Sequence, residues 1–202
     1  MALAGKLGAV YVQTDDAPVA FTDEATTANA ARTRYTITDT TKRYWSKGTA
    51  VVVEVGGVAV TTGYTLEYAG GVVVFDVAQG VGAVVTVTGA YVALAEAGGF
   101  YNWSLEPSVD MQEKTAFQSS GWKEFESTVK GFTGSAEAFW GDDQFFTALG
   151  TEVIVALYLN EATGLRYEGY AVISGDGIST AVDELIQETV DFTGDGPICY
   201  RG

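Results

Sequence analysis

A chain of 202 residues with 47% hydrophobic and 18% charged residues can bury a real core in a single domain, and its 25 glycines favour a turn-rich β protein over disorder. The formal net charge is −15, and it is lopsided: residues 1–100 carry 9 acids and 6 bases (−3), whereas residues 101–202 carry 17 acids and 5 bases (−12). Such acidity disfavours recognition of DNA in a groove, although a charge that only maintains solubility is its commonest explanation.

The first forty residues predict two short strands with a polar segment between them. Residues 7–12 (LGAVYV) have the apolar character of a strand, and residues 34–38 (RYTIT) alternate as a strand does. Residues 13–29 are rich in Thr, Ala and Asp, and we expect a long loop there. That loop is one candidate for contacts that form only on assembly.

A glycine-rich antiparallel meander is predicted over residues 41–92. Between residues 47 and 92, runs of β-branched residues recur about every eight to ten positions with glycine turns between them. Residues 93–99 are small and link this meander back to the main body. We therefore expect residues 1–40 and 93–202 to form one β-sandwich domain, with residues 41–92 inserted and packed on it.

The second half begins with a loop around Pro107 and continues into a long strand-like run over residues 121–140. Glu124, Glu126 and Thr128 share one face of that run under strict alternation. Gly131 and Gly134 predict a bend partway along it.

One short helix and three strands complete the chain. Residues 142–149 predict the helix, capped by Asp142 or Asp143 and ended by Gly150. Residues 153–159 and 165–180 predict strands around an NEATG turn, and residues 184–192 are interpreted as a strand on their alternation. The fold class expected is mainly β: an antiparallel β-sandwich or half-barrel with one short flanking α-helix and a glycine-rich β-meander insertion.

The residue types needed for common catalysis and cofactor binding are missing. The chain has no histidine, no Walker-type phosphate loop and no G-x-G-x-x-G after a strand. Cys199 is the only cysteine, so no internal disulfide can form, and it is more simply a bystander than a nucleophile. No run of 18 apolar residues and no convincing signal peptide occurs, so we expect a soluble protein made in the cytoplasm, with no membrane partner.

Two weak patterns could carry chemistry, and each has a simpler explanation. Glu124 and Glu126 could form a glycosidase pair, but solvated acids on a strand face are far commoner. The triplets at residues 175–177 and 194–196 (both GDG) could offer oxygen ligands to Ca²⁺, but tight turns explain them more simply. We therefore expect no enzyme activity, catalytic residue, metal or cofactor.

The chain also has four tryptophans and eleven tyrosines, which raise an alternative function. Trp45 and Trp103 lie near predicted turns, where aromatic rings that stack on sugars occur. The alternative is therefore a carbohydrate-binding β-sandwich module of a phage or bacterial surface protein. Core packing and subunit contacts are the commoner uses of large aromatic side chains.

Several strand-like motifs follow one another in a recognisable order. They are RTRYTI, YTLEYAGGVVVF, VTVTGAY, WSLEP, GWKEFESTVKGFTGSAEA, VIVALYL and YEGYAVISGDGISTAVDELIQETVDFTGDGP. In this order, over nearly the whole chain, the sequence resembles the major tail tube protein of long-tailed, siphovirus-like bacteriophages.

The resemblance implies a structural subunit of the virion tail, assembled in the host cytoplasm. In that family, hexameric rings stack into a hollow tube, and the inner strands join into a continuous β-barrel through which DNA passes without specific binding. The partners implied are further copies of the chain and the tail terminator, tape-measure and distal tail proteins. The lumen-facing candidates are Glu124, Glu126, Thr128, Gln187, Thr189 and Asp191.

Overall fold

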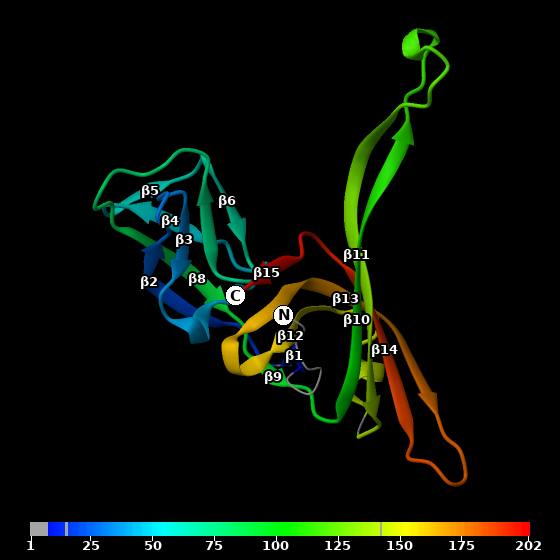
Figure 1. Cartoon of the computed structure of the whole chain (residues 1–202). Coiled ribbons are helices and arrows are strands. Elements are labelled where there is room, and N and C mark those ends of the chain that lie inside the picture. Colours follow the sequence, from blue (N-terminus) through cyan, green and yellow to red (C-terminus); the bar gives the residue numbers. More distant parts are fainter. Residues whose placement is uncertain (1–7, 15, 142) are drawn as a thin grey trace. The chain divides into compact units, whose positions relative to one another are not determined.

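The computed structural model describes residues 8–14, 16–141 and 143–202. The fold is mainly β with antiparallel pairing, and one short α-helix is present in the described chain. Contacts between Cα atoms separate two compact units (Figure 1): unit 1 comprises residues up to Tyr11 together with Glu96–Gly202, and unit 2 comprises Val12–Ala95. The expected fold class is thus confirmed.

The sheet of unit 1 has the strand order β10-β11-β14-β13-β12-β1-β9, and a further strand, β15, pairs with β13. β10 and β11 form a long hairpin, visible in Figure 1 as the extended green arm. The bounds are β1 (Ala9–Gln13), β9 (Leu94–Glu96), β10 (Phe100–Glu113), β11 (Phe125–Phe139), β12 (Glu152–Asn160), β13 (Leu165–Ser179), β14 (Gln187–Gly194) and β15 (Cys199–Arg201).

The predicted strands of the last fifty residues are present. β12 and β13 pair on either side of the 3₁₀ turn η4 (Glu161–Thr163), which ends at Gly164 with a φ of 75°. β14 covers most of the segment interpreted as a strand from its alternation. Five successive residues of β12, Val153 to Leu157, are buried, as in a strand covered on both faces.

The helix is shorter than expected: α1 spans Gln144–Thr147. Asp143 stands at its N-cap but makes no side-chain capping hydrogen bond, and Asp142 lies outside the described residues. The helix buries Phe145, whereas Phe146 is exposed. A helix of about one turn has little stability of its own, so packing of Phe145 holds it.

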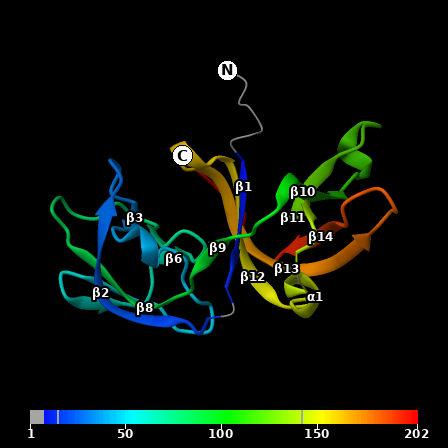
Figure 2. The same ribbon diagram turned by 90° about the horizontal axis from the view of Figure 1, so that it is seen from below.

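The sheet of unit 2 has the order β5-β4-β8-β2-β3-β7-β6 and curls around its own core (Figure 2). Its strands are β2 (Val19–Ala28), β3 (Arg34–Ile37), β4 (Val52–Val55), β5 (Val58–Val60), β6 (Tyr64–Glu67), β7 (Val72–Phe75) and β8 (Val85–Tyr91). The core collects buried side chains from these strands and the loops between them: Phe21, Tyr35, Ile37, Trp45, Val51, Val53, Val73, Phe75, Val85 and Val87.

The expected loop at residues 13–29 is wrong, because most of it forms β2. Residues Val19 to Ala25 of this strand pair with β8, and Thr26 to Ala28 pair with β3. A register shift between Phe21 and Glu24 contains Asp23 with a φ of 50°, and this break hides the alternation in the sequence. The predicted domain boundaries stay a prediction, but the pairing joins β2 and β3, both from residues 1–40, to the meander strands.

Two further expectations of loops are wrong. Pro107, expected in a loop, lies within β10 and pairs with Phe132. An edge strand tolerates proline because every second N–H faces away from the partner strand. Residues 175–177, expected as a tight turn, lie inside β13, where a Cβ on Gly175 would be 3.1 Å from Oδ2 of Asp191. The triplet therefore gives this carboxylate room against the neighbouring backbone.

Candidate assembly surface

One face of the sheet formed by β10, β11, β14 and the end of β13 is polar. Strand register places Ser104, Ser135 and Asp191 side by side on it, and Glu106, Thr133 and Thr193 form the next row. We call this the polar face; its members on the three strands are Ser104, Glu106, Thr133, Ser135, Glu137, Gln187, Thr189, Asp191 and Thr193. None of them is buried.

The alternate residues of the same strands form a buried face. Phe132, Val190 and Phe192 are each no more than 3% exposed. The ring of Phe192 lies against Gly134, where an added Cβ would be 2.4 Å from Cζ, and the ring of Phe132 covers Gly194 in the same way at 2.3 Å. A one-residue slip would expose these rings and bury the acids, so packing fixes which side chains face solvent.

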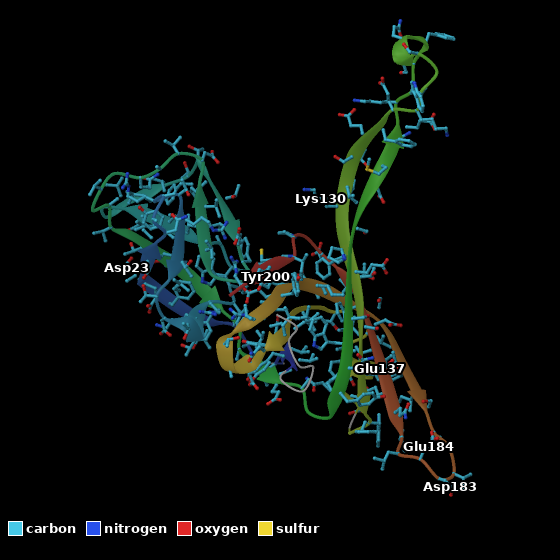
Figure 3. All side chains as sticks on the ribbon, in the orientation of Figure 1. Asp23, Lys130, Glu137, Asp183, Glu184 and Tyr200 are labelled. Carbon is cyan, nitrogen blue, oxygen red and sulfur yellow. The ribbon has the colours of Figure 1, made fainter. Side chains whose placement is uncertain are left out.

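The candidates of β14 lie on the polar face. Gln187, Thr189 and Asp191 pair with Phe139, Glu137 and Ser135 of β11. Figure 3 labels Glu137, whose carboxylate accepts a hydrogen bond from Asn102 Nδ2 at 3.0 Å. The three candidates therefore share one face.

The candidates of β11 reach the same face through a bulge. Between the pairs Val109↔Lys130 and Met111↔Ser127, β10 has one residue and β11 has two, Thr128 and Val129. Such an extra residue reverses the alternation beyond it. Glu126, which strict alternation would put with buried Phe132, is thereby placed opposite Gln112, on the same side as Ser104.

Thr128 lies within the bulge, and its hydroxyl donates to the Asp110 carbonyl at 3.1 Å. Glu124 precedes β11, and its carbonyl accepts a hydrogen bond from Lys114 N at 2.9 Å, so it continues the pairing. The structure thus groups five of the six lumen-facing candidates on one face and puts Thr128 in the bulge between them. Nothing in the sequence marked the bulge, since residues 128 and 129 are not glycines.

The polar face combines carboxylates with hydroxyl groups. A hollow of about 340 Å³ is lined by Ser104, Glu106, Thr133, Gly134, Ser135, Ser174, Asp191, Phe192 and Thr193. The hydroxyls of Ser104 and Ser135 lie 3.0 Å apart, and Thr193 donates to Ser174 at 3.4 Å. Within the described chain, no cluster of three or more His, Cys, Asp or Glu residues could hold a metal ion. The face can present negative charge and hydrogen-bonding groups to a polar medium.

The opposite face of the β10–β11 arm exposes three large apolar side chains, which lie opposite Lys130, Ser127 and Glu113. Val109, Met111 and Phe125 are all between 44% and 55% exposed, and they continue the face that buries Phe132 nearer the body. Figure 3 shows the arm extending beyond Lys130 to a small 3₁₀ turn, η3 (Phe117–Ser119). Several large apolar side chains exposed along a projecting hairpin are typical of an interaction surface.

A buried ion network fixes the C-terminal strand. Glu168 is completely buried, and it accepts hydrogen bonds from Arg166 Nε at 2.7 Å and from Arg201 Nε at 2.8 Å. Arg166 also lies over the Tyr158 ring, 5.4 Å from its centre. This network joins β12, β13 and β15.

β1 is joined to the same region by Tyr11, whose hydroxyl donates to Glu161 Oε1 at 2.5 Å. That hydrogen bond, followed by burial and the charge of Glu161, raises the pKa of Tyr11 to about 12. Its ring is 5.0 Å from that of Tyr158. These contacts are structural and lie away from the polar face.

The proposed sugar platform is not supported by the positions of the tryptophans. Trp45 is 0% exposed in the core of unit 2, so it cannot stack on a sugar ring. Trp103 is half-buried on β10. The more exposed tryptophans are Trp122 and Trp140, which the alternative did not use. In the described part of the chain, no helix has the length and apolar character needed to cross a bilayer.

Comparisons with known proteins give limited likenesses. No family model matches the sequence, and no curated protein does. Among solved structures, a chain from the tail of an empty gene transfer agent particle, computed with helical refinement and C6 symmetry, is 13% identical with a TM-score of 0.47, over 55% of this chain and 87% of that one. A chain from the virion of a native gene transfer agent particle is 13% identical with a TM-score of 0.43, over 54% of this chain and 89% of the other.

Proposed function

We propose that the chain is a structural, non-enzymatic subunit of the tail tube of a phage-like particle, in which hexameric rings stack around a channel for DNA. The observation that carries the proposal is an open sheet with a continuous acidic and hydroxyl-bearing face. The order of the sequence motifs, which resembles that of tail tube proteins, supports the same assignment. The hexameric ring in the proposal is taken from that family. The partners and the virion location named for that family are part of the proposal.

The outer edge of β10 and that of the last residues of β13 are unpaired in the described chain and suit joining between copies. In the described structure β10 is the last strand of its sheet and pairs with β11 alone. At the other side, residues 175–179 of β13 pair with β14, whereas β12 pairs only with β13 residues up to Val172. An exposed edge of this length invites another strand. Pairing β10 of one copy with the end of β13 of the next would close a barrel and leave no edge.

In such a barrel the polar face would form the channel wall, because the opposite face is buried in the subunit around Phe132, Val190 and Phe192. Glu106, Glu126 and Asp191 would then repel the phosphates of passing DNA. At physiological ionic strength this repulsion acts within about 8 Å of the wall. Lys114, a base beside this face, is paired with Glu126 at 3.7 Å, and the acids of the wall outnumber it. The wall would therefore gain little from the release of counterions from DNA, and the DNA would pass without binding.

Electron microscopy of the purified full-length protein tests the proposal. We expect negatively stained rings with six-fold symmetry or hollow tubes built from them. Analytical ultracentrifugation over a range of protein and salt concentrations checks that the assemblies exist in solution. A chain that stays monomeric under all these conditions, in addition to parent particles that contain it but have no tube, contradicts the proposal.

A further inference from the structure

Unit 1 carries two exposed apolar tips at opposite ends of its sheet (Figures 1 and 3). The arm tip, residues 114–124, connects β10 to β11 and exposes Phe117 fully and Trp122 to 80%. The turn tip, residues 180–186, connects β13 to β14 and exposes Val182 fully and Leu185 to 67%. Large apolar side chains held in solvent at the ends of an element are unfavourable unless a partner covers them.

The arm tip is a loop whose backbone is fixed by internal hydrogen bonds and whose aromatic rings point outward. Within it, Ala116 N donates to Ser119 Oγ at 3.1 Å, and Trp122 N donates to the Ser119 carbonyl at 2.9 Å. Glu124 N donates to Thr115 Oγ1 at 3.1 Å. Ser119 is buried at the centre of this turn. The hydrogen bonds fix the backbone, so less conformational entropy is lost when the rings meet a partner.

The two tips are complementary in charge. The arm tip carries Lys114, Lys123 and Glu124, which give it a net charge of +1. The two lysine side chains contact Glu126 and Glu113 at 3.7 and 3.2 Å and are still 52% and 71% exposed. The turn tip carries Asp183 and Glu184 and contains no base. Of the other three bases of the second half of the chain, Lys130 lies on the arm outside its tip, and Arg166 and Arg201 are bound to buried Glu168. The arm is therefore where this half can offer positive charge.

The turn tip also offers a seat for an apolar side chain. A hollow of about 110 Å³ is lined by Ser179, Thr180, Ala181, Glu184, Leu185 and Gln187. Its apolar walls come from the side of the turn that exposes Leu185, and Glu184 provides a carboxylate beside them. An aromatic ring flanked by a lysine matches this combination.

We propose that the arm tip of one copy docks on the turn tip of the next copy along the tube. Phe117 and Trp122 pack on Val182 and Leu185, while the lysines of the arm tip face the acids of the turn tip. This inference rests on the proposed function, in which copies stack. Because the two patches differ and lie at opposite ends of one unit, the contact is head-to-tail and leaves a free patch at each end. Such a contact repeats without closing, as the growth of a tube requires.

Disulfide cross-linking between cysteines introduced at the two tips detects the contact directly. In the full chain with Cys199→Ser, the pair Trp122→Cys and Leu185→Cys should give a ladder of oligomers on oxidation that disappears on reduction. Either cysteine alone should give dimers at most, because each copy then has a single thiol. Tubes that form normally from the double variant but yield no ladder overturn the inference and leave the proposed function standing.

A charge-swap test measures the amount of sedimentable tube. This amount should fall by about tenfold or more when both lysines are reversed (Lys114→Glu with Lys123→Glu) or both acids are reversed (Asp183→Lys with Glu184→Lys), because like charges then meet. Combining all four changes should restore tubes. Lys130→Glu, on the arm but outside its tip, is the matched control and should change nothing.

The outcomes separate the two proposals. Reversed variants that still form rings but no longer stack, with rescue by the four-fold variant, support the docking of the tips. Tubes indifferent to both reversals overturn it. If the wild-type chain forms no rings, the proposed function fails, and the disulfide ladder still decides whether the tips meet head-to-tail.

Discussion

Glu168 is the residue on which the C-terminal edge of unit 1 depends most. Its carboxylate is completely buried and receives Arg166 and Arg201 on its two oxygens. An ion pair of this kind contributes little net stability over an apolar pair of similar shape, but removing one partner leaves a buried charge without compensation. The network therefore fixes where β15 pairs with β13.

Replacing Glu168 by glutamine should lower the free energy of unfolding by about 3 kcal/mol, because Arg166 stays buried without its counter-charge. Urea denaturation followed by tryptophan fluorescence measures the change. Glu113→Gln is the control in the same unit: its pair with Lys123 is exposed, and we expect a change of no more than about 0.5 kcal/mol. Equal effects of the two substitutions would contradict the assignment of Glu168.

Among the elements, strands with an unbroken apolar pattern were predictable and strands with a break were not. β14 alternates and β12 is a continuous apolar run, so the sequence predicts both as strands. β2 contains a register shift at Asp23, and its polar, threonine-rich residues look like a loop until two neighbouring strands supply hydrogen bonds. A short stretch of sequence does not show which distant strands it will pair with, and this strand was therefore missed.

The candidate surface shows the same limit. Alternation alone predicts that Glu126 and Thr128 share a face, but it cannot relate that face to the one bearing Asp191. The bulge at residues 128 and 129 makes that connection, and it comes from the register of β10 against β11. The residue types of a polar wall were visible in the sequence, whereas their alignment across strands required the structure. Their orientation toward a lumen stays a prediction.

The close packing of β11 on β14 provides a test at this scale. A Cβ at Gly134 would lie 2.4 Å from the Phe192 ring and 2.5 Å from the Ser104 carbonyl oxygen, so Gly134→Ala must displace a neighbouring strand. We expect it to destabilise unit 1 by about 1–3 kcal/mol. Gly131→Ala on the same strand is the control, because its nearest neighbour would be Ser108 Oγ at 3.9 Å.

Thermal and chemical denaturation of both variants compares them directly. Gly131→Ala should be neutral or slightly stabilising, since alanine loses less backbone entropy than glycine on folding. A Gly134→Ala protein as stable as the wild type would show that Phe192 does not seal β11 against β14. The register that places Asp191 beside Ser135 would then have another cause.

At the scale of the whole molecule, the features that we assign to assembly all lie in one of the two units. The free edge of β10, the polar face and both exposed tips belong to unit 1. The chain leaves for unit 2 after β1 and returns at β9, and Thr14 N donates to the Ala93 carbonyl at 3.0 Å at that point. Neighbouring strand ends of this kind are typical of an inserted unit that can be removed without breaking its host.

Deleting residues 15–92 and joining Thr14 to Ala93 through Asn-Gly should therefore leave an assembling protein. The hydrogen bonds Thr14 N to Ala93 O and Ala97 N to Val10 O show that β1 and β9 run antiparallel, so a two-residue hairpin turn fits between them. We expect a β-type circular dichroism spectrum and tubes in negative stain. Residues 12–95 expressed alone should fold and stay monomeric, because the features that we assign to assembly are outside them. If the full chain forms tubes but the shortened chain folds and stays monomeric, a contact essential for assembly lies in unit 2.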